Sequence, residues 1–87
     1  MKGFIQSVSE LTEVPFDEMS GYRIIATNNS AVFVEGIKGI GNYSGSELEI
    51  RLKRGKIIVT GEGLTVTRLN RDEIFAKGKI ANISIEE

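Results

Sequence analysis

Four cations are crowded into one short stretch of the sequence, and they are Arg51, Lys53, Arg54 and Lys56. Guanidinium and ammonium groups gathered at the end of a hairpin can contact the phosphates of a nucleic acid or of a lipid surface. No aromatic residue for base stacking alternates with these cations, and Glu47 and Glu49 lie just upstream. Charged residues also keep hairpin tips soluble. A solvated turn is therefore favoured over an anion-binding site.

Glycines form a second candidate, because they let backbone amides approach a phosphate closely. Gly36, Gly39 and Gly41 follow a predicted strand. Their spacing matches neither the Walker pattern nor the dinucleotide fingerprint, and no helical pattern follows them. Bends or bulges within a strand explain these glycines better than a phosphate site does.

Groups that could carry catalysis are scarce. The 87 residues include no histidine and no cysteine, so the commonest general base and the thiolate metal ligands are missing. Carboxylates occur in pairs beside predicted turns, on the polar face of a strand or at the terminus: Asp17-Glu18, Glu47 with Glu49, Asp72-Glu73 and Glu86-Glu87. Paired acids need environments that separate their pKa values, and solvated surface positions do not supply them. We therefore expect no enzyme, no cofactor and no metal.

An apolar stripe near the N-terminus is the candidate for partner binding. Its members recur at i, i+1, i+4 and i+7, and they are Phe4, Ile5, Val8 and Leu11. This spacing predicts a short helix over residues 2–13 that ends before Pro15. The helix would pack either on the chain's own sheet or on a partner. Its acidic residues argue against an anionic membrane surface.

The elements that position these candidates are organised around a hairpin at Arg54-Gly55. Aliphatic and charged residues alternate before the turn, which predicts a half-buried strand. A two-residue turn would place Leu52 opposite Ile57 and Ile50 opposite Val59. All four side chains would then share one buried face.

Strand patterns and turn residues continue through the rest of the chain. Further strands are predicted at residues 22–27, 31–35, 36–45, 64–67, 73–77 and 79–85. Short strands joined by tight turns favour an antiparallel meander, hence a small β-sandwich or a partly closed barrel. We expect one domain over residues 1–87, with a helical segment at residues 1–20 and strands at 21–87. No apolar run is long enough to span a membrane, so an intracellular protein is the default.

The order and spacing of several segments carry a family resemblance. The segments are Leu11-Thr12-Glu13-Val14-Pro15, residues 31–35 with Gly36-Ile37-Lys38-Gly39-Ile40, residues 48–52 with Gly55-Lys56-Ile57-Ile58-Val59-Thr60-Gly61, and residues 74–83. Taken together they resemble the YabP/YqfC family of sporulation proteins, most closely its YqfC branch.

The resemblance implies a small sandwich of immunoglobulin-like architecture and a non-enzymatic role in the mother cell. It also implies that the protein contributes to assembly of the spore envelope, in the cortex or the coat. A membrane-anchored sporulation protein is compatible with this role as a partner. Our first hypothesis is an assembly protein that binds other sporulation proteins, or further copies of itself, in the cytoplasm at the forespore envelope. The alternative is a small nucleic-acid-binding barrel that uses Arg51, Lys53, Arg54 and Lys56.

Overall fold

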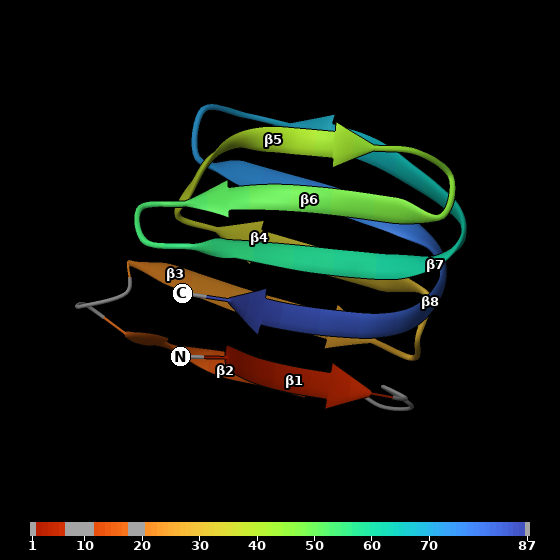
Figure 1. Cartoon of the computed structure of the whole chain (residues 1–87), viewed down its shortest axis with the longest axis horizontal. Coiled ribbons are helices and arrows are strands. Elements are labelled where there is room, and N and C mark those ends of the chain that lie inside the picture. The colour runs from red at the N-terminus through yellow and green to blue at the C-terminus, as the bar shows by residue number, and fades with distance from the viewer. Residues whose placement is uncertain (1, 7–11, 18–20, 87) are drawn as a thin grey trace.

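The computed structural model describes residues 2–6, 12–17 and 21–86, and eight strands account for most of them (Figure 1). In chain order the strands are β1 (Lys2–Gln6), β2 (Thr12–Asp17), β3 (Tyr22–Thr27), β4 (Ala31–Glu35), β5 (Ile37–Tyr43), β6 (Glu47–Leu52), β7 (Lys56–Leu69) and β8 (Glu73–Glu86). No helix occurs in this part of the chain. The prediction of a mainly β, antiparallel fold is confirmed.

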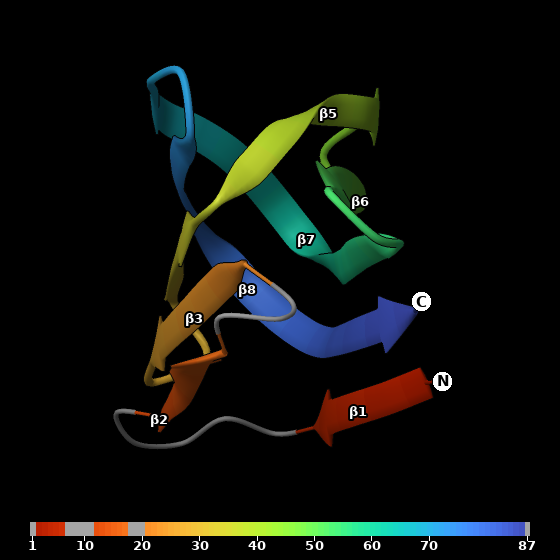
Figure 2. The same cartoon turned by 90° about the vertical axis from the view of Figure 1, so that its left-hand side faces the viewer.

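The strands form one coiled sheet in the order β2-β3-β4-β8-β7-β6-β5, and β1 pairs with β8 beside this path. Strands β7 and β8 have 14 residues each, about twice the length of the others. Because they are so long, each of these two strands extends from one side of the curled sheet to the other. Figure 2 shows the sheet curling around its own interior, while the ends of the strand order, β2 and β5, do not pair with each other. The sheet is therefore not closed into a barrel.

The pairing of β8 defines two layers. Its first residues pair with β4, from Glu73 opposite Glu35 to Lys77 opposite Ala31. Its last residues pair with β1, and Glu86 lies opposite Lys2. We call β5, β6, β1 and the adjoining halves of β7 and β8 the first layer. The second layer consists of β2, β3, β4 and the other halves of β7 and β8.

Both layers bury their inner residues in a single aliphatic core. The most deeply buried side chains are Ile24, Val32, Val34, Leu48, Ile50, Ile57, Val59, Ile74 and Ile83. None of the described buried residues is polar or charged. Alternation along each strand sends these side chains to one side of the sheet, so the curl of the sheet is what closes the core.

Both long strands bend where they pass from one layer to the other. The register between them shifts at Thr60/Gly61 and again between Glu62 and Thr65. Gly78 has a φ of 145°, in the region that favours glycine. A Cβ at Gly61 would collide with the carbonyl oxygen of Lys79, so only glycine lets the two backbones approach so closely.

Two hairpin turns cover the backbone groups exposed by these bends. From the β3–β4 turn, the Asn29 carbonyl accepts a 2.7 Å hydrogen bond from the Ile80 N–H. From the β5–β6 turn, the Ser46 carbonyl accepts a 3.0 Å bond from the Gly61 N–H. Asn28 and Asn29 have φ of 48° and 53°, as a tight turn with two left-handed residues requires. Unpaired amides at the bends are thus satisfied by the turns.

The β6–β7 hairpin has the predicted faces but not the predicted register. Ile50 lies opposite Ile57 and Leu48 opposite Val59, two residues from the expected pairing. The Leu52 N–H donates a 3.0 Å hydrogen bond to the Gly55 carbonyl, so Lys53 and Arg54 lie between the bonded residues and the turn comes one residue earlier than expected. A shift of two residues restores every side chain to its original face, which is why the buried set is unchanged.

The structure describes no helix at residues 2–6 or 12–17, and residues 7–11 of the helix predicted over residues 2–13 lie outside the described part of the chain. Residues 2–6 form β1, in which Ile5 lies opposite the buried Ile83 and Phe4 lies opposite Ser84. Pairing with β8, nearly 80 residues away, overrides the local helical spacing. Pro15 lies in the edge strand β2, at an irregularity of its register.

Candidate interaction surfaces

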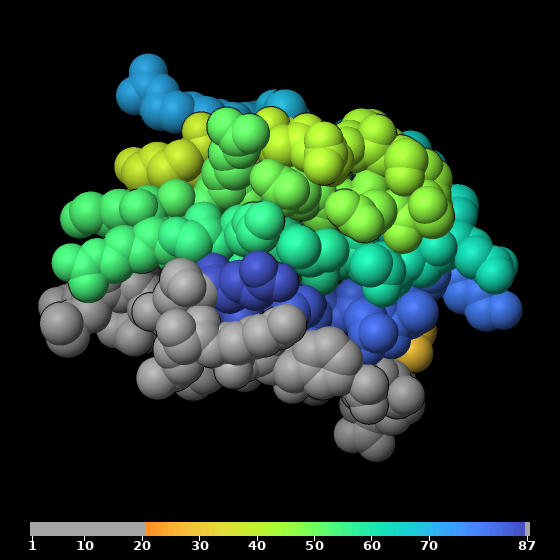
Figure 3. Space-filling model, viewed as in Figure 1, coloured from red at the N-terminus to blue at the C-terminus, as the bar shows by residue number. Residues whose placement is uncertain are grey.

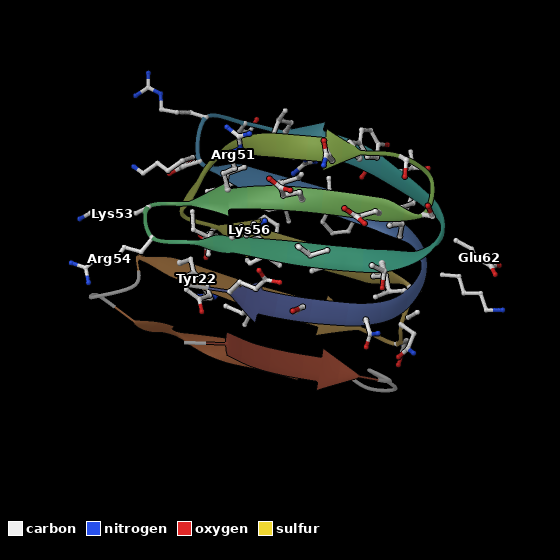
Figure 4. All side chains as sticks on the ribbon, in the orientation of Figure 1. Tyr22, Arg51, Lys53, Arg54, Lys56 and Glu62 are labelled. Atoms are coloured by element: carbon white, nitrogen blue, oxygen red, sulfur yellow. The ribbon has the colours of Figure 1, made fainter. Side chains whose placement is uncertain are left out.

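The four predicted cations surround the tip of the β6–β7 hairpin but do not form one cluster (Figure 4). Lys53 and Arg54 are exposed on the turn and project away from the sheet. Arg51 and Lys56 lie opposite each other in the register, on the outer face of the first layer. An anion approaching the tip would therefore meet two projecting cations.

Carboxylates accompany the other two cations. The Arg51 Nε lies 3.7 Å from the Glu49 Oε2 in an ion pair. Glu86 lies opposite Lys56 in the register of β7 and β8. The outer face beside the tip is balanced in charge, which favours the interpretation of a soluble hairpin rim.

The N-terminal stripe is divided by the strand arrangement. Phe4 and Ile5 lie in β1, whereas Val8 and Leu11 lie outside the described residues. Their proposed contact with a partner stays a prediction, and the single helical face on which it was based does not form at residues 2–6.

The glycines between β4 and β6 have structural roles. Gly36 has a φ of 85°, and a Cβ there would collide with the carbonyl oxygen of Gly21. The register of β5 against β6 shifts between Ile37 and Gly39 and again between Ile40 and Tyr43. The predicted bends and bulges are confirmed.

Acidic side chains are the strongest candidates for metal ligands in a chain without histidine or cysteine. Across residues 21–86 and the two N-terminal strands, no three Asp or Glu side chains form a group that could hold a metal ion. Glu73 accepts a 3.2 Å hydrogen bond from the Asn70 side-chain amide in the β7–β8 turn.

An open hollow of about 580 Å³ lies beside the bends of β7 and β8. It is lined by Asn29, Ser46, Thr60, Gly61, Glu62, Lys79, Ile80 and Ala81. Figure 4 places the exposed Glu62 at the end of the molecule opposite the cationic tip. The Asn29 Oδ1 is buried without a hydrogen-bond partner. Sequence reasoning missed this hollow because it arises only where the β3–β4 turn meets the bend of β8.

A row of large apolar residues crosses the outer face of the second layer, and we call it the outer apolar row. It consists of Ile25, Phe33 and Phe75, which are neighbours in the register of β3, β4 and β8. All three are half-buried, although they lie on the side of the sheet away from the core. The sequence signal for this row is the continuous apolar run in each of these strands. A strand with one face exposed to solvent alternates apolar and polar residues instead.

The outer face of the first layer is different in character. Figure 3 shows this face, with β5, β6 and parts of β7 and β8 in view. Ile58 is its half-buried apolar residue, between Glu49 and Ser84 in the register. The neighbouring positions Glu47, Thr60 and Asn82 are polar. Among the side chains that the structure describes on these two outer faces, the three adjoining large apolar residues lie on the second layer.

A model of the YabP family matches residues 18–87, four fifths of the sequence. The chain belongs to the YabP family. YabP proteins are associated with sporulation, so the resemblance drawn from the sequence is confirmed at the level of the family. The match covers β3 to β8, and therefore both the cationic tip and the outer apolar row of this YabP-family chain. No curated protein matches the chain.

Among the described residues of the YabP-family chain, no helix has the length and apolar character needed to cross a membrane.

Proposed function

We propose that this chain is a non-enzymatic sporulation protein that contributes to assembly of the spore envelope through protein–protein contacts. It acts in the mother cell, in the cytoplasm at the forespore envelope, on the cortex or the coat. As a member of the YqfC branch, it would work with other sporulation proteins, one of them membrane-anchored. Membership of the YabP family supports the link to sporulation.

The outer apolar row is the observation that carries the contact function. Three large side chains, Ile25, Phe33 and Phe75, adjoin one another on a face that the chain's own core does not use. Contiguous apolar patches on soluble domains commonly mark sites where another macromolecule binds. A binding partner that covers this row would remove its apolar area from water, and the free energy gained would favour binding.

Deletion of the coding sequence in a spore-forming host tests the proposal. We expect fewer heat-resistant and lysozyme-resistant spores, with defects of the cortex or coat in thin sections. Complementation with the wild-type chain should restore resistance, whereas a Phe33→Ser, Phe75→Ser variant should not. An Ile58→Ser variant, altered on the other outer face, is the matched control and should complement. Normal spores from the deletion strain would overturn the proposal.

A further inference from the structure

The strands that carry the outer apolar row have sequences suited to burial on both faces. In β3, Ile24 is buried and the adjacent Ile25 is apolar as well. In β4, Phe33 stands between the buried Val32 and Val34. Near-continuous apolar runs are typical of strands that are covered on both sides. Within the described part of the chain, the core covers only the inner side of these strands.

Two rows that contain charged residues flank the outer apolar row, one on each side. On one side the register aligns Arg23, Glu35 and Glu73, and the Arg23 Nε lies 3.4 Å from the Glu35 Oε1. On the other side it aligns Thr27, Ala31 and Lys77. An acid on β8 and a cation on the same strand thus lie on opposite sides of the apolar row. This layout is complementary to itself after a rotation by 180°.

We infer that two copies of the chain pack face to face through the second layer, on a two-fold axis that runs along the outer apolar row. Phe33 and Phe75 of one copy then lie over the same residues of the other. Glu73 meets Lys77 of the second copy, and symmetry forms this pair twice. The ion pair of Arg23 with Glu35 faces the uncharged Thr27 and Ala31. The inference deepens the proposed function by naming a second copy as one partner.

The direction of the axis follows from the charges. An axis parallel to the strands and through β4 would superimpose the apolar residues and pair Arg23 with Glu73 of the second copy, but it would place Glu35 on Glu35 at the centre of the face. Like charges directly opposite each other are destabilising. The axis along the row brings two charged residues near their own equivalents, Glu13 and Arg68, and these lie at the two ends of the row. Exposed charges at an edge are screened by solvent and salt.

The size of the face indicates a weak dimer. Four strands about 4.8 Å apart and three rows of residues give a footprint of roughly 350 Å² per copy. Stable interfaces bury about 800 Å² on each partner. The dimer is therefore weak, with a dissociation constant on the order of 10–100 µM.

Sedimentation equilibrium of the full chain from 10 µM to 1 mM tests the inference. We expect the wild type to change from monomer to dimer over this range. Phe33→Ser should weaken dimerisation at least tenfold, and Ile58→Ser should leave it unchanged. Circular dichroism and urea unfolding of each variant establish that the fold is retained.

A charge swap tests the arrangement itself. Glu73→Lys and Lys77→Glu should each weaken the dimer about threefold or more, and the double variant should restore it. Four residues of a strand span about 13 Å, so positions 73 and 77 do not touch within one chain. Rescue can therefore come only from a contact between copies.

Three results would overturn the inference: a wild type that stays monomeric to 1 mM, a dimer that survives Phe33→Ser, or a double variant that is not rescued. If the wild type is monomeric and deletion of the coding sequence still causes the sporulation defect described above, the dimer is ruled out and the proposed function is not. Capture of a different protein on this face by a chain that stays monomeric would likewise count against the dimer.

Discussion

The N–H of Val66 donates a 2.9 Å hydrogen bond to the hydroxyl of Tyr43. The same hydroxyl lies 3.4 Å from the carbonyl oxygen of Leu64, to which it donates. Tyr43 ends β5, one limit of the strand order, whereas Val66 lies in β7 where that strand belongs to the second layer. The side chain of Tyr43 therefore bridges the gap between β5 in the first layer and this half of β7 in the second layer.

Loss of this hydroxyl should loosen the gap. Tyr43→Phe keeps the ring and removes both hydrogen bonds, so we expect the free energy of unfolding to fall by about 0.5–1.5 kcal/mol. Urea denaturation followed by circular dichroism measures the change. Asn42→Ala, at the neighbouring exposed position, serves as the control and should be nearly neutral. Equal losses in the two variants would show that the bridge contributes nothing.

Two adjacent isoleucines of β7 test the assignment of faces. Ile57 is fully buried in the core, and Ile58 lies half-buried on the outer face. Ile57→Ala should therefore cost about 2–5 kcal/mol of unfolding free energy, because it leaves a cavity. Ile58→Ala should cost less than about 1 kcal/mol. A larger loss at position 58 than at position 57 would reverse the assigned faces.

The bend of β7 depends on a glycine without room for a side chain. In Gly61→Ala the new methyl group would collide with the Lys79 carbonyl oxygen, and we expect a loss of about 1–3 kcal/mol. Gly39→Ala is the matched substitution, since nothing lies within 4 Å of its added Cβ. Thermal unfolding of the two variants provides the comparison. An unchanged midpoint for Gly61→Ala would mean that the two strands can separate without cost.

The cationic tip should tolerate loss of its charge. Lys53→Glu combined with Arg54→Glu alters two exposed residues, so the unfolding free energy should change by less than about 0.5 kcal/mol. We also expect neither the wild type nor this variant to bind single-stranded DNA or RNA in 50 mM salt, as measured by fluorescence anisotropy. Binding by the wild type that disappears in the variant and weakens steeply with salt would instead support the nucleic-acid alternative.

Local patterns predicted the faces of most strands because alternation depends only on which side of the sheet a residue occupies. They could not determine the register of the β6–β7 hairpin, since a slip of two residues leaves Ile50 and Val59 equally buried. Local patterns also gave no sign of the strand pairing at residues 2–6. The pairing that makes Lys2–Gln6 a strand involves Asn82 to Glu86, and no pattern within residues 2–13 encodes that contact.

The surfaces of interest were harder to predict than the strands. The cations at positions 51–56 were candidates because of their residue types. The structure places Lys53 and Arg54 on the turn and Arg51 opposite Lys56 on the sheet, with Glu49 and Glu86 as neighbours. The outer apolar row was present in the sequence as a departure from alternation. It became visible as a row only when Phe33 was aligned with Ile25 and Phe75. Alignment across strands is a property of the sheet, so composition and spacing along the chain do not contain it.

The passage of β7 and β8 through both layers has a consequence for the order of folding. These strands form one long hairpin closed by the turn at residues 70–72, so their mutual contacts begin close together along the chain. They can form early, because closing a short loop costs little entropy. Contact between β1 and the end of β8 joins the two ends of the sequence and carries the greatest closure entropy. Amide hydrogens of the long hairpin should therefore exchange with solvent last, and those of β1 among the first.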